Sequence, residues 1–431
     1  TGKILAMAGG KDYFGSPEPK GCKPGVNCKF EPNVNVATSE RQPGSSFKPY
    51  MYLTAFKPEY GLTPMSKVLD VPTNFGTAGG RAYIPQNYDG SSHGLITIRK
   101  ALAGSLNVPA VRTLATIGVD PVVKTAHDLG ISSPLKNCGL SLVLGGCEIQ
   151  LVDHVGAFAV LANGGKGTGA TAFNRIEDKH GKVLEEYREP SEQTVNPEAV
   201  FELTSIMTDD LSRQYVFGSK SPLTLPNRVV AAKTGTTQNW KDGWTLGFTP
   251  QLAAGVWAGN NDSSLMRAGA DGVFVAAPMW NRFMELALAG QPAVDFPVPS
   301  GIVQIAYDPG SNRPATKTNK NTRLEPFPWY ALPKEAQISA APKSLNKGLL
   351  TPIVEPIIPT PLTAPSTLPK PAPVTPLPAP VPGIVVPDNI PNTSQSYIYE
   401  PTIEYQPDYG GLPNDYPTEP QAVVPGRPAD I

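Results

Sequence analysis

The sequence lacks an excess of charge of either sign. Its 431 residues include 36 Lys and Arg against 37 Asp and Glu, and nowhere do the basic residues form a run. Proteins that bind the phosphate backbone of a nucleic acid concentrate lysine and arginine on one surface. We therefore predict that nucleic acid is not a partner of this protein.

Long apolar runs are missing as well. A helix that crosses a bilayer needs about 18 or more apolar residues in succession, and the sequence contains no such stretch. The first residues, Thr1-Gly2-Lys3, do not begin an export signal, and residues 2–10 have the pattern of a strand with no turn before it. We therefore interpret the chain as a piece of a longer protein and expect membrane attachment only through a missing N-terminal anchor.

Cysteine and histidine are scarce, with four residues of each. The cysteines lack the tight Cys-x-x-Cys spacing of a zinc site and have no histidine paired with them, so we predict no metal and no other cofactor. Two local disulfides, Cys22–Cys28 and Cys138–Cys147, are the simplest of the three connectivities that four cysteines allow. They would indicate an oxidising compartment, and free thiols remain the alternative.

Proline is abundant but unevenly placed. Of the 49 prolines, 27 lie at or beyond Pro309, and few apolar residues recur at helix or strand spacing after about residue 331. We predict one folded domain over residues 1–300, a linker over 301–350 and a Pro-rich, low-complexity tail over 351–431. The tail is expected to be disordered, with a polyproline-like stretch over 352–391.

Within residues 1–300 the pattern predicts an α+β domain. Proline is tolerated only in the first turn of a helix, so Pro49 predicts a helix that begins near residues 44–46. Further helices are expected over residues 95–117, 120–130, 148–163, 197–211 and 277–289, and strands over 228–236, 243–248 and 252–259. Strands this close in sequence pair antiparallel, and the last helix would cover their sheet.

Ser45 and Lys48 are the pair that points to chemistry. Three residues apart at the start of a helix, they lie on one face, where the lysine can take the proton of the serine and make it a nucleophile. A lysine acts as a base only when it is neutral, so its pKa has to be lowered by burial or by a second cation. Lys233, on the first predicted strand, is the candidate for that cation.

Short motifs need their context, because the sequence contains similar patterns elsewhere. Ser-x-x-Lys also occurs at Ser133–Lys136, where a proline indicates a loop, and at Ser344–Lys347, at the edge of the Pro-rich tail. Residues 166–169 resemble Lys-Thr-Gly only superficially. The set that occurs in the order helix start, interhelical loop, strand is Ser45/Lys48, Ser105-Leu106-Asn107 and Lys233-Thr234-Gly235-Thr236.

Ser-x-x-Lys, Ser-x-Asn and Lys-Thr-Gly together are signature motifs of penicillin-binding proteins and class A β-lactamases. Over about residues 1–300 the chain resembles the transpeptidase domain of bifunctional (class A) penicillin-binding proteins, since the flanking segments match too, at residues 41–49, 83–90, 141–146 and 242–250. The resemblance implies the penicillin-binding and serine β-lactamase-like fold, in which a five-stranded antiparallel sheet lies between helices, beside a helical subdomain. The glycosyltransferase domain of that family is absent, and the four cysteines are not part of its pattern.

The resemblance also implies a catalytic role for four residues. Ser45 would attack the carbonyl between the two terminal D-alanines of a peptidoglycan stem peptide, and Lys48 would take its proton. Ser105 would relay a proton to the leaving amine, and Asn107 would hold Lys48 and the substrate amide.

Substrate binding is implied for the strand motif. Lys233, Thr234 and Thr236 would bind the terminal carboxylate, and Gly235 would let the substrate approach the backbone. The backbone N–H groups of Ser45 and Thr236 would form the oxyanion hole.

The expected function is therefore that of a peptidoglycan DD-transpeptidase, a serine acyltransferase that acts outside the cytoplasm of a bacterium and that β-lactams acylate. One alternative is a hydrolase of the same fold, a DD-carboxypeptidase or a β-lactamase. A β-lactamase needs a carboxylate to activate water, but no glutamate can be assigned to a loop in that role, and Glu148 is expected to belong to a helix. The other alternative is a non-catalytic cell-wall binding or sensor module.

Six further residues receive no catalytic role. The histidines are predicted to be structural or on the surface: His93, His127, His154 and His180. Tyr88 and Trp244 are expected either to pack in the core or to line the cleft.

Overall fold

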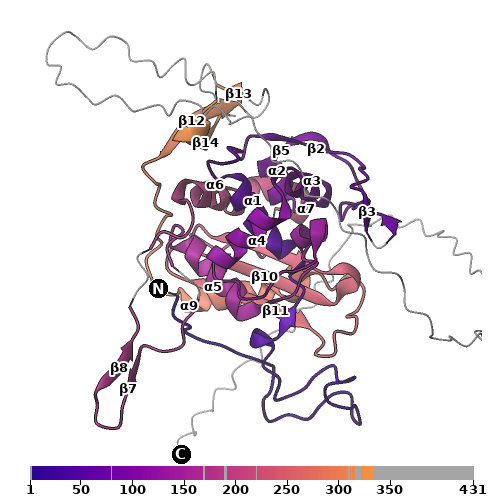
Figure 1. The fold of residues 1–431 in the computed structure, drawn as a ribbon, viewed down its shortest axis with the longest axis vertical. Coiled ribbons are helices and arrows are strands. Elements are labelled where there is room, and N and C mark those ends of the chain that lie inside the picture. Colours follow the sequence, from indigo (N-terminus) through magenta and orange to yellow (C-terminus); the bar gives the residue numbers. More distant parts are fainter. Residues whose placement is uncertain are drawn as a thin grey trace, which may run out of the picture. The chain divides into compact units, whose positions relative to one another are not determined.

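The computed structural model describes residues 2–78, 80–167, 170–188, 192–219, 221–308, 311, 313–315 and 322–333, all within one unit of the chain, residues 1–347 (Figure 1). The predicted tail over 351–431 lies outside the described residues, and so do Ser344 and Lys347 of the second Ser-x-x-Lys pattern.

A central sheet of three antiparallel strands has the order β11-β10-β9, with β9 (Ala231–Thr236), β10 (Asp242–Phe248) and β11 (Ala253–Gly259). Every residue of β10 is buried, because helices cover both faces of the sheet. Helix α5 (Leu151–Ala162) packs on one face, where a side chain at Gly255 would meet Val155. Helix α9 (Ala277–Ala287) packs on the other face, where Trp280 contacts Gly247. These layers confirm the α+β prediction, although the resemblance implied five strands and the described part of the chain has three in this sheet.

A helical region lies beside the sheet (Figure 1). It consists of α1 (Lys48–Ala55), α2 (Ile98–Ala103), α3 (Asn107–Ile117), α4 (Val119–Asp128), α6 (Pro197–Met207) and α7 (Asp210–Phe217). All eight residues of α1 are buried, since α3, α4 and α6 pack around it. The predicted helices at 95–117, 120–130 and 197–211 are confirmed with two changes: residues 104–106 divide the first, and α6 ends before Asp209, which caps α7.

The start of α1 differs from the prediction. A 3₁₀ turn, η2 (Gly44–Phe47), comes first, and the α-helix begins at Lys48 with Pro49 in its first turn. Proline fits there, because the first N–H groups of a helix have no partner within the helix. In a 3₁₀ turn, residues i and i+3 lie directly over one another. The turn therefore places the side chains of Ser45 and Lys48 in line on one face.

Four short hairpins or strand pairs surround these layers: β1 (Glu40–Arg41) with β6 (Ile149–Gln150), β2 (Lys67–Asp70) with β5 (Gly94–Thr97), β3 (Thr77–Ala78) with β4 (Arg81–Ala82), and β7 (Arg175–Glu177) with β8 (Val183–Glu186). The last pair forms a hairpin that projects from the body of the domain (Figure 1). The strand predicted over residues 2–10 is wrong, since this segment contributes a single bridge between Lys3 and Thr171.

A second sheet follows the predicted domain boundary. Strands β12 (Ile302–Asp308), β13 (Arg313–Pro314) and β14 (Arg323–Pro328) have the order β13-β12-β14, where we predicted a linker over 301–350. The four residues from Glu325 to the end of β14 are buried, and β14 packs on α6. Glu325 is buried because it accepts hydrogen bonds from Arg99 of α2, at 2.6 and 2.9 Å. That partner lies 226 residues away, so the local pattern could not indicate it.

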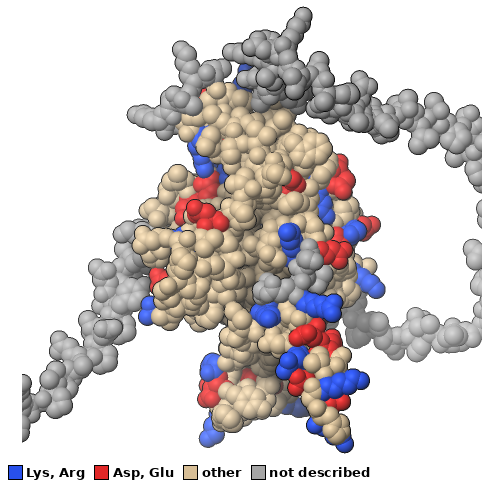
Figure 2. Space-filling view, turned by 90° about the vertical axis from the view of Figure 1, so that its left-hand side faces the viewer, with Lys and Arg blue, Asp and Glu red and all other residues tan. Residues whose placement is uncertain are grey.

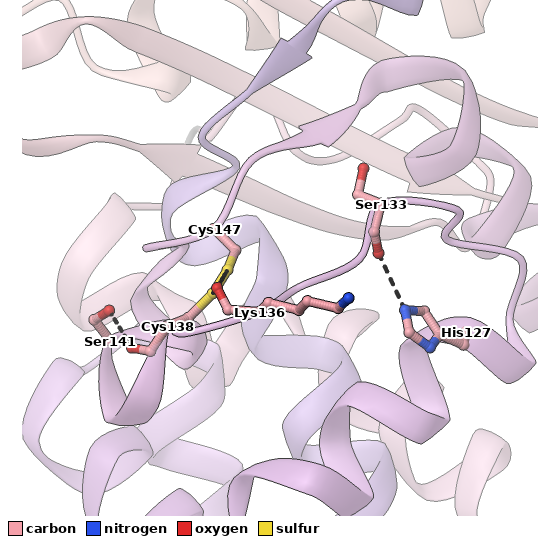
Figure 3. Close-up of a disulfide and its surroundings, with 6 residues drawn as sticks. All are labelled: His127, Ser133, Lys136, Cys138, Ser141 and Cys147. Atoms are coloured by element: carbon pink, nitrogen blue, oxygen red, sulfur yellow. Dashed lines mark hydrogen bonds between the residues drawn. A yellow bond between two sulfur atoms is a disulfide. The ribbon is translucent and has the colours of Figure 1, made fainter.

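Both predicted disulfides are present. Cys22 bonds to Cys28 with 5.2 Å between their Cα atoms, and Cys138 bonds to Cys147 with 5.8 Å. The second disulfide closes the segment that contains the 3₁₀ helix η3 (Gly139–Leu144), as Figure 3 shows.

Charged side chains of both signs are interspersed on the face of the molecule that Figure 2 shows. Among the described residues, none of the helices has the length and apolar character needed to span a bilayer.

Candidate active site

Ser45, the candidate nucleophile, lies on η2, and Lys48 follows it as the first residue of α1. Ser45 is half-buried, whereas Lys48 has no solvent-exposed surface. The Nζ atom of Lys48 lies 2.9 Å from Ser45 Oγ, 2.7 Å from Asn107 Oδ1 and 2.5 Å from the carbonyl oxygen of Ser105. The side chain of Lys48 is therefore held by three groups, one of which is the hydroxyl that it would have to deprotonate.

These contacts suit a neutral amine. Burial, and after it the charge of Lys233, lowers the pKa of Lys48 well below its usual value. A neutral lysine has two N–H bonds and one lone pair. Because the Ser105 carbonyl and the Asn107 amide oxygen can only accept, they take the two N–H groups. The lone pair is then directed at the hydroxyl of Ser45, as a general base requires.

Ser105 lies between the two lysines of the site. It interrupts the helices α2 and α3 with a left-handed backbone (φ 57°), a conformation that costs free energy in a residue other than glycine. Its Oγ accepts a hydrogen bond from Lys233 Nζ at 2.8 Å and lies 3.5 Å from Lys48 Nζ. Ser105 Oγ can therefore accept a proton from Lys48 while it donates its own hydroxyl proton to another group.

Lys233 projects from β9 and is buried, with 5% of its surface exposed. Besides Ser105, it donates a hydrogen bond to the carbonyl of Thr234 at 2.8 Å. Burial, and then the charge of Arg213 on α7, lowers the pKa of Lys233 to about 7. The site thus contains two buried amines with lowered pKa values: the charge of Lys233 acts on Lys48, and the charge of Arg213 acts on Lys233.

The turn η2 and the end of β9 approach each other through glycines. A side chain at Gly235 would collide with the carbonyl of Pro43. Gly44 has φ 56°, and a side chain there would meet the backbone of Thr236. Only glycine allows two backbones to come this close. As a result, the backbone around Ser45 lies next to the backbone of Thr236. The hydroxyl of Thr236 accepts a hydrogen bond from the N–H of Gly272 at 3.0 Å, which fixes its position.

The structure thus brings together residues from all three motifs. Hydrogen bonds connect Ser45, Lys48, Ser105, Asn107 and Lys233, and Thr234, Gly235 and Thr236 continue along β9 beside η2.

Three other predictions are decided by the structure. Trp244 is buried and donates its indole N–H to the carbonyl of Gln42 at 2.8 Å, so it belongs to the core. Tyr88 is 71% exposed and donates to Asp271 at 2.8 Å, so it does not pack in the core. The placement of Glu148 in a helix is wrong, because this exposed residue precedes β6 and α5 begins at Leu151.

The first alternative Ser-x-x-Lys pattern forms no comparable pair. Figure 3 shows the hydroxyl of Ser133 pointing away from the side chain of Lys136. That hydroxyl donates to Glu40 at 3.2 Å, and the carbonyl of Ser133 accepts a hydrogen bond from His127 at 3.0 Å. The loop that Pro134 predicts is therefore what the structure contains, since residues 129–138 form neither helix nor strand.

Two residues at the site were missed by the sequence reasoning. Arg213 has 3% of its surface exposed and acts on Lys233, but nothing in its sequence context indicated this. His154 is fully buried and hydrogen-bonds Ser46, the neighbour of Ser45. Its position among apolar residues of the predicted helix 148–163 was the available signal that it is buried.

The comparison with protein families agrees with the motifs. The family described as penicillin binding protein transpeptidase domain matches residues 1–285. The chain belongs to this family. The match ends before β12, so the sheet β13-β12-β14 lies outside it.

Individual relatives are penicillin-binding proteins. The chain is 35% identical to penicillin-binding protein 2D of Bacillus subtilis over 318 residues, which is 72% of this chain and 42% of the relative. It is 31% identical to penicillin-binding protein 1A of Aquifex aeolicus over 312 residues, or 72% of this chain and 40% of the relative. The chain therefore spans less than half the length of these two relatives.

Solved structures of penicillin-binding proteins share the fold. Penicillin-binding protein 1A from Haemophilus influenzae matches with a TM-score of 0.58 at 23% identity, over 68% of this chain and 49% of that one. The PonA1 protein from Mycobacterium tuberculosis, solved in complex with penicillin V, matches with a TM-score of 0.53 at 26% identity. That match covers 62% of this chain and 74% of PonA1. The prediction of a penicillin-binding transpeptidase fold is thereby confirmed.

Proposed function

We propose that this transpeptidase domain cross-links peptidoglycan stem peptides that end in D-Ala-D-Ala, through an acyl-enzyme on Ser45. The observation that carries the proposal is the continuous series of hydrogen-bonding contacts from Ser45 through Lys48 and Ser105 to Lys233. Each of its steps is short enough for a proton to move along it, and both amines have lowered pKa values.

In the first step, the hydroxyl of Ser45 gives its proton to neutral Lys48 as Oγ attacks the carbonyl carbon between the two D-alanines. The carbonyl oxygen becomes an oxyanion, which the N–H groups of Ser45 and Thr236 would stabilise. Loss of one such donor typically raises the barrier by about 3 to 4 kcal/mol. The proximity of Gly44 to the backbone of Thr236 supports this pairing of donors.

In the second step, the C–N bond breaks and the terminal D-alanine leaves with a proton. Ser105 donates that proton and is reprotonated from Lys48, which returns to its neutral state. An ester between Ser45 and the penultimate D-alanine remains. The amine of a second stem peptide then attacks the ester, forms the cross-link and releases Ser45, with Lys48 and Ser105 carrying protons in the reverse direction.

The terminal carboxylate of the substrate would bind at β9, to Lys233, Thr234 and Thr236. A carboxylate beside Lys233 favours its charged form, so substrate binding would raise the pKa of Lys233 from about 7. Lys48 would then stay neutral beside a charged Lys233. Gly235 lets β9 lie directly against the backbone of η2, which would keep these carboxylate-binding residues beside Ser45.

The proposal includes β-lactams as acylating inhibitors and a location outside the cytoplasm, in the periplasm or on the outer face of the membrane. PonA1, which shares the fold, is the relative with penicillin V in its structure. The two disulfides support an oxidising compartment.

The decisive experiment is covalent labelling of the 431-residue chain with fluorescent penicillin. We expect Ser45→Ala to abolish labelling and Ser133→Ala, in the other described Ser-x-x-Lys pattern, to leave it unchanged. Labelling that persists in Ser45→Ala would refute the proposed nucleophile. Absence of labelling in the wild type would favour a binding module without catalysis. Rapid turnover of a chromogenic β-lactam would favour a hydrolase.

A further inference from the structure

A buried chain of hydrogen-bonded polar side chains connects the nucleophile turn η2 with helix α5. The hydroxyl of Ser46, next to Ser45, lies 2.7 Å from the carbonyl of Pro43 and 2.8 Å from Nε2 of His154. On the other side of the imidazole, Nδ1 lies 2.5 Å from the hydroxyl of Tyr50. None of Ser46, Tyr50 and His154 has any exposed surface.

The direction of each hydrogen bond in this chain follows from its end. The carbonyl of Pro43 can only accept, so the single proton of the Ser46 hydroxyl is used there. Nε2 of His154 must then donate to Ser46 Oγ. Burial lowers the pKa of His154 to about 3, so the ring is neutral at physiological pH and carries its single proton on Nε2. Nδ1 has no proton and accepts a hydrogen bond from the hydroxyl of Tyr50.

The ring of His154 is fixed in place by its neighbours. It makes edge contacts with Phe158 of its own helix and with Trp244 of β10, at centroid distances of 5.2 and 5.7 Å. Trp244 in turn donates to the carbonyl of Gln42. The carbonyl of Gln42 is thus held by Trp244 of β10, and the carbonyl of Pro43 by Ser46, whose hydroxyl is in turn held by His154 of α5.

We propose that His154 is a positioning residue, which holds Ser46 and with it the turn η2 at the distance from β9 that the oxyanion site requires. The inference rests on the proposed function, because it assumes that Ser45 is the nucleophile. Nε2–H of His154 supplies the hydrogen bond that Ser46 cannot obtain from Pro43. Without that donor, Ser46 Oγ is a buried acceptor with one partner fewer, and η2 is free to shift away from Thr236.

The test compares His154→Gln with His154→Met in the 431-residue chain. Both variants remove the ring and have similar length, so they lose similar packing, but only glutamine offers an N–H to Ser46. We expect the acylation rate with fluorescent penicillin to fall about tenfold in His154→Met and less than about threefold in His154→Gln, as the loss of one buried hydrogen bond implies. Equal rates in the two variants would overturn the inference.

A second measurement does not depend on a variant that folds. Nitrogen-15 NMR of the wild-type imidazole is expected to show the neutral tautomer protonated at Nε2, and protonation at Nδ1 would overturn the inference. In addition, Ser46→Ala should remove the difference between the His154 variants, since the donor then has no acceptor. Failure of the proposed function is recognised separately, because Ser45→Ala would then still be labelled.

Discussion

Two groups of charged side chains, one buried and one largely buried, differ in their partners. At the site, Lys48 and Lys233 share Ser105, and among the described residues no carboxylate is hydrogen-bonded to either amine. The second group, which we call the clamp, consists of Arg99, Asp209, Arg323 and Glu325. There Arg99 contacts Glu325 at 2.6 Å and Asp209 at 3.3 Å, and Arg323 contacts Asp209 at 2.5 Å.

The site and the clamp differ in what offsets the free-energy cost of burying a charged side chain. In the clamp each cation has an anion beside it. Burial alone would raise the pKa of Asp209, but hydrogen bonds from Ser212 and the charges of Arg99 and Arg323 lower it overall. At the site, Lys48 and Lys233 have hydrogen bonds but no anion to offset the cost of burying their charge, and the pKa values of both lysines are lowered. Paired charges therefore join elements of the fold, whereas unpaired buried amines become reactive bases.

The largest expected effect is on the rate of acylation. Replacing Lys48 with methionine keeps the volume but removes the base, and loss of a positioned general base typically costs about 10²- to 10⁴-fold in rate. We expect the labelling rate with fluorescent penicillin to fall within this range. Lys136→Met, in the Ser133 pattern, is the matched control and should label at the wild-type rate. A Lys48→Met chain that labels normally would remove the distinction between site and clamp.

A smaller effect, on stability, is expected from the clamp. Glu325→Ala leaves the buried guanidinium of Arg99 without its closest anion, and removing one partner of a buried pair costs about 3 to 5 kcal/mol. The free energy of unfolding in urea should fall by about this amount. Glu285→Ala is the control, because its contact with Arg282 is 3.7 Å long and exposed, so the loss should stay below about 1 kcal/mol. Equal losses in both variants would show that the clamp contributes no more than a surface pair.

A third expected effect is a pH dependence of stability. Lysine has a pKa of about 10.4 in an unfolded chain, and the fold lowers that of Lys233 to about 7. Between these values the unfolded state binds more protons, so the contribution of Lys233 to the free energy of unfolding rises with pH and is lowest below pH 7. The free energy of unfolding of the wild type minus that of Lys233→Met should therefore increase from about pH 7 to pH 10. A difference that stays constant over this pH range would contradict the lowered pKa of Lys233.

Some parts of the fold could be predicted because short-range constraints decide them. Pro49 restricts the start of a helix to within a few residues, and the strand spacing at 231–259 allows antiparallel pairing with short turns. The same reasoning was less successful where one local sequence pattern is compatible with two conformations. It could not tell a 3₁₀ turn from an α-helical one at Ser45, and it assigned Glu148 to a helix that begins three residues later.

The C-terminal sheet is the clearest case of information that the local pattern did not contain. Residues 302–328 are rich in polar residues and proline, which is typical of a linker. The described strands β12, β13 and β14 nevertheless form a sheet there, and Glu325 and Arg323 on β14 have charge partners on α2 and at the N-cap of α7, more than a hundred residues away. Periodicity within a segment cannot indicate such a partner, since burial of Glu325 is favourable only when Arg99 is already in place.

Ser45 illustrates the division between sequence and structure at the site. By itself, the sequence determined which residue types are available and in what order: a serine and a lysine three residues apart before Pro49, a Ser-x-Asn loop and a Lys-Thr-Gly strand, because covalent spacing and backbone preferences act over a few residues. Only the tertiary structure decided that Lys233 reaches Ser105, that Arg213 lies behind Lys233 and that His154 holds Ser46. Burial and electrostatic pairing depend on residues that are distant in sequence, and these determine the pKa values on which the chemistry depends.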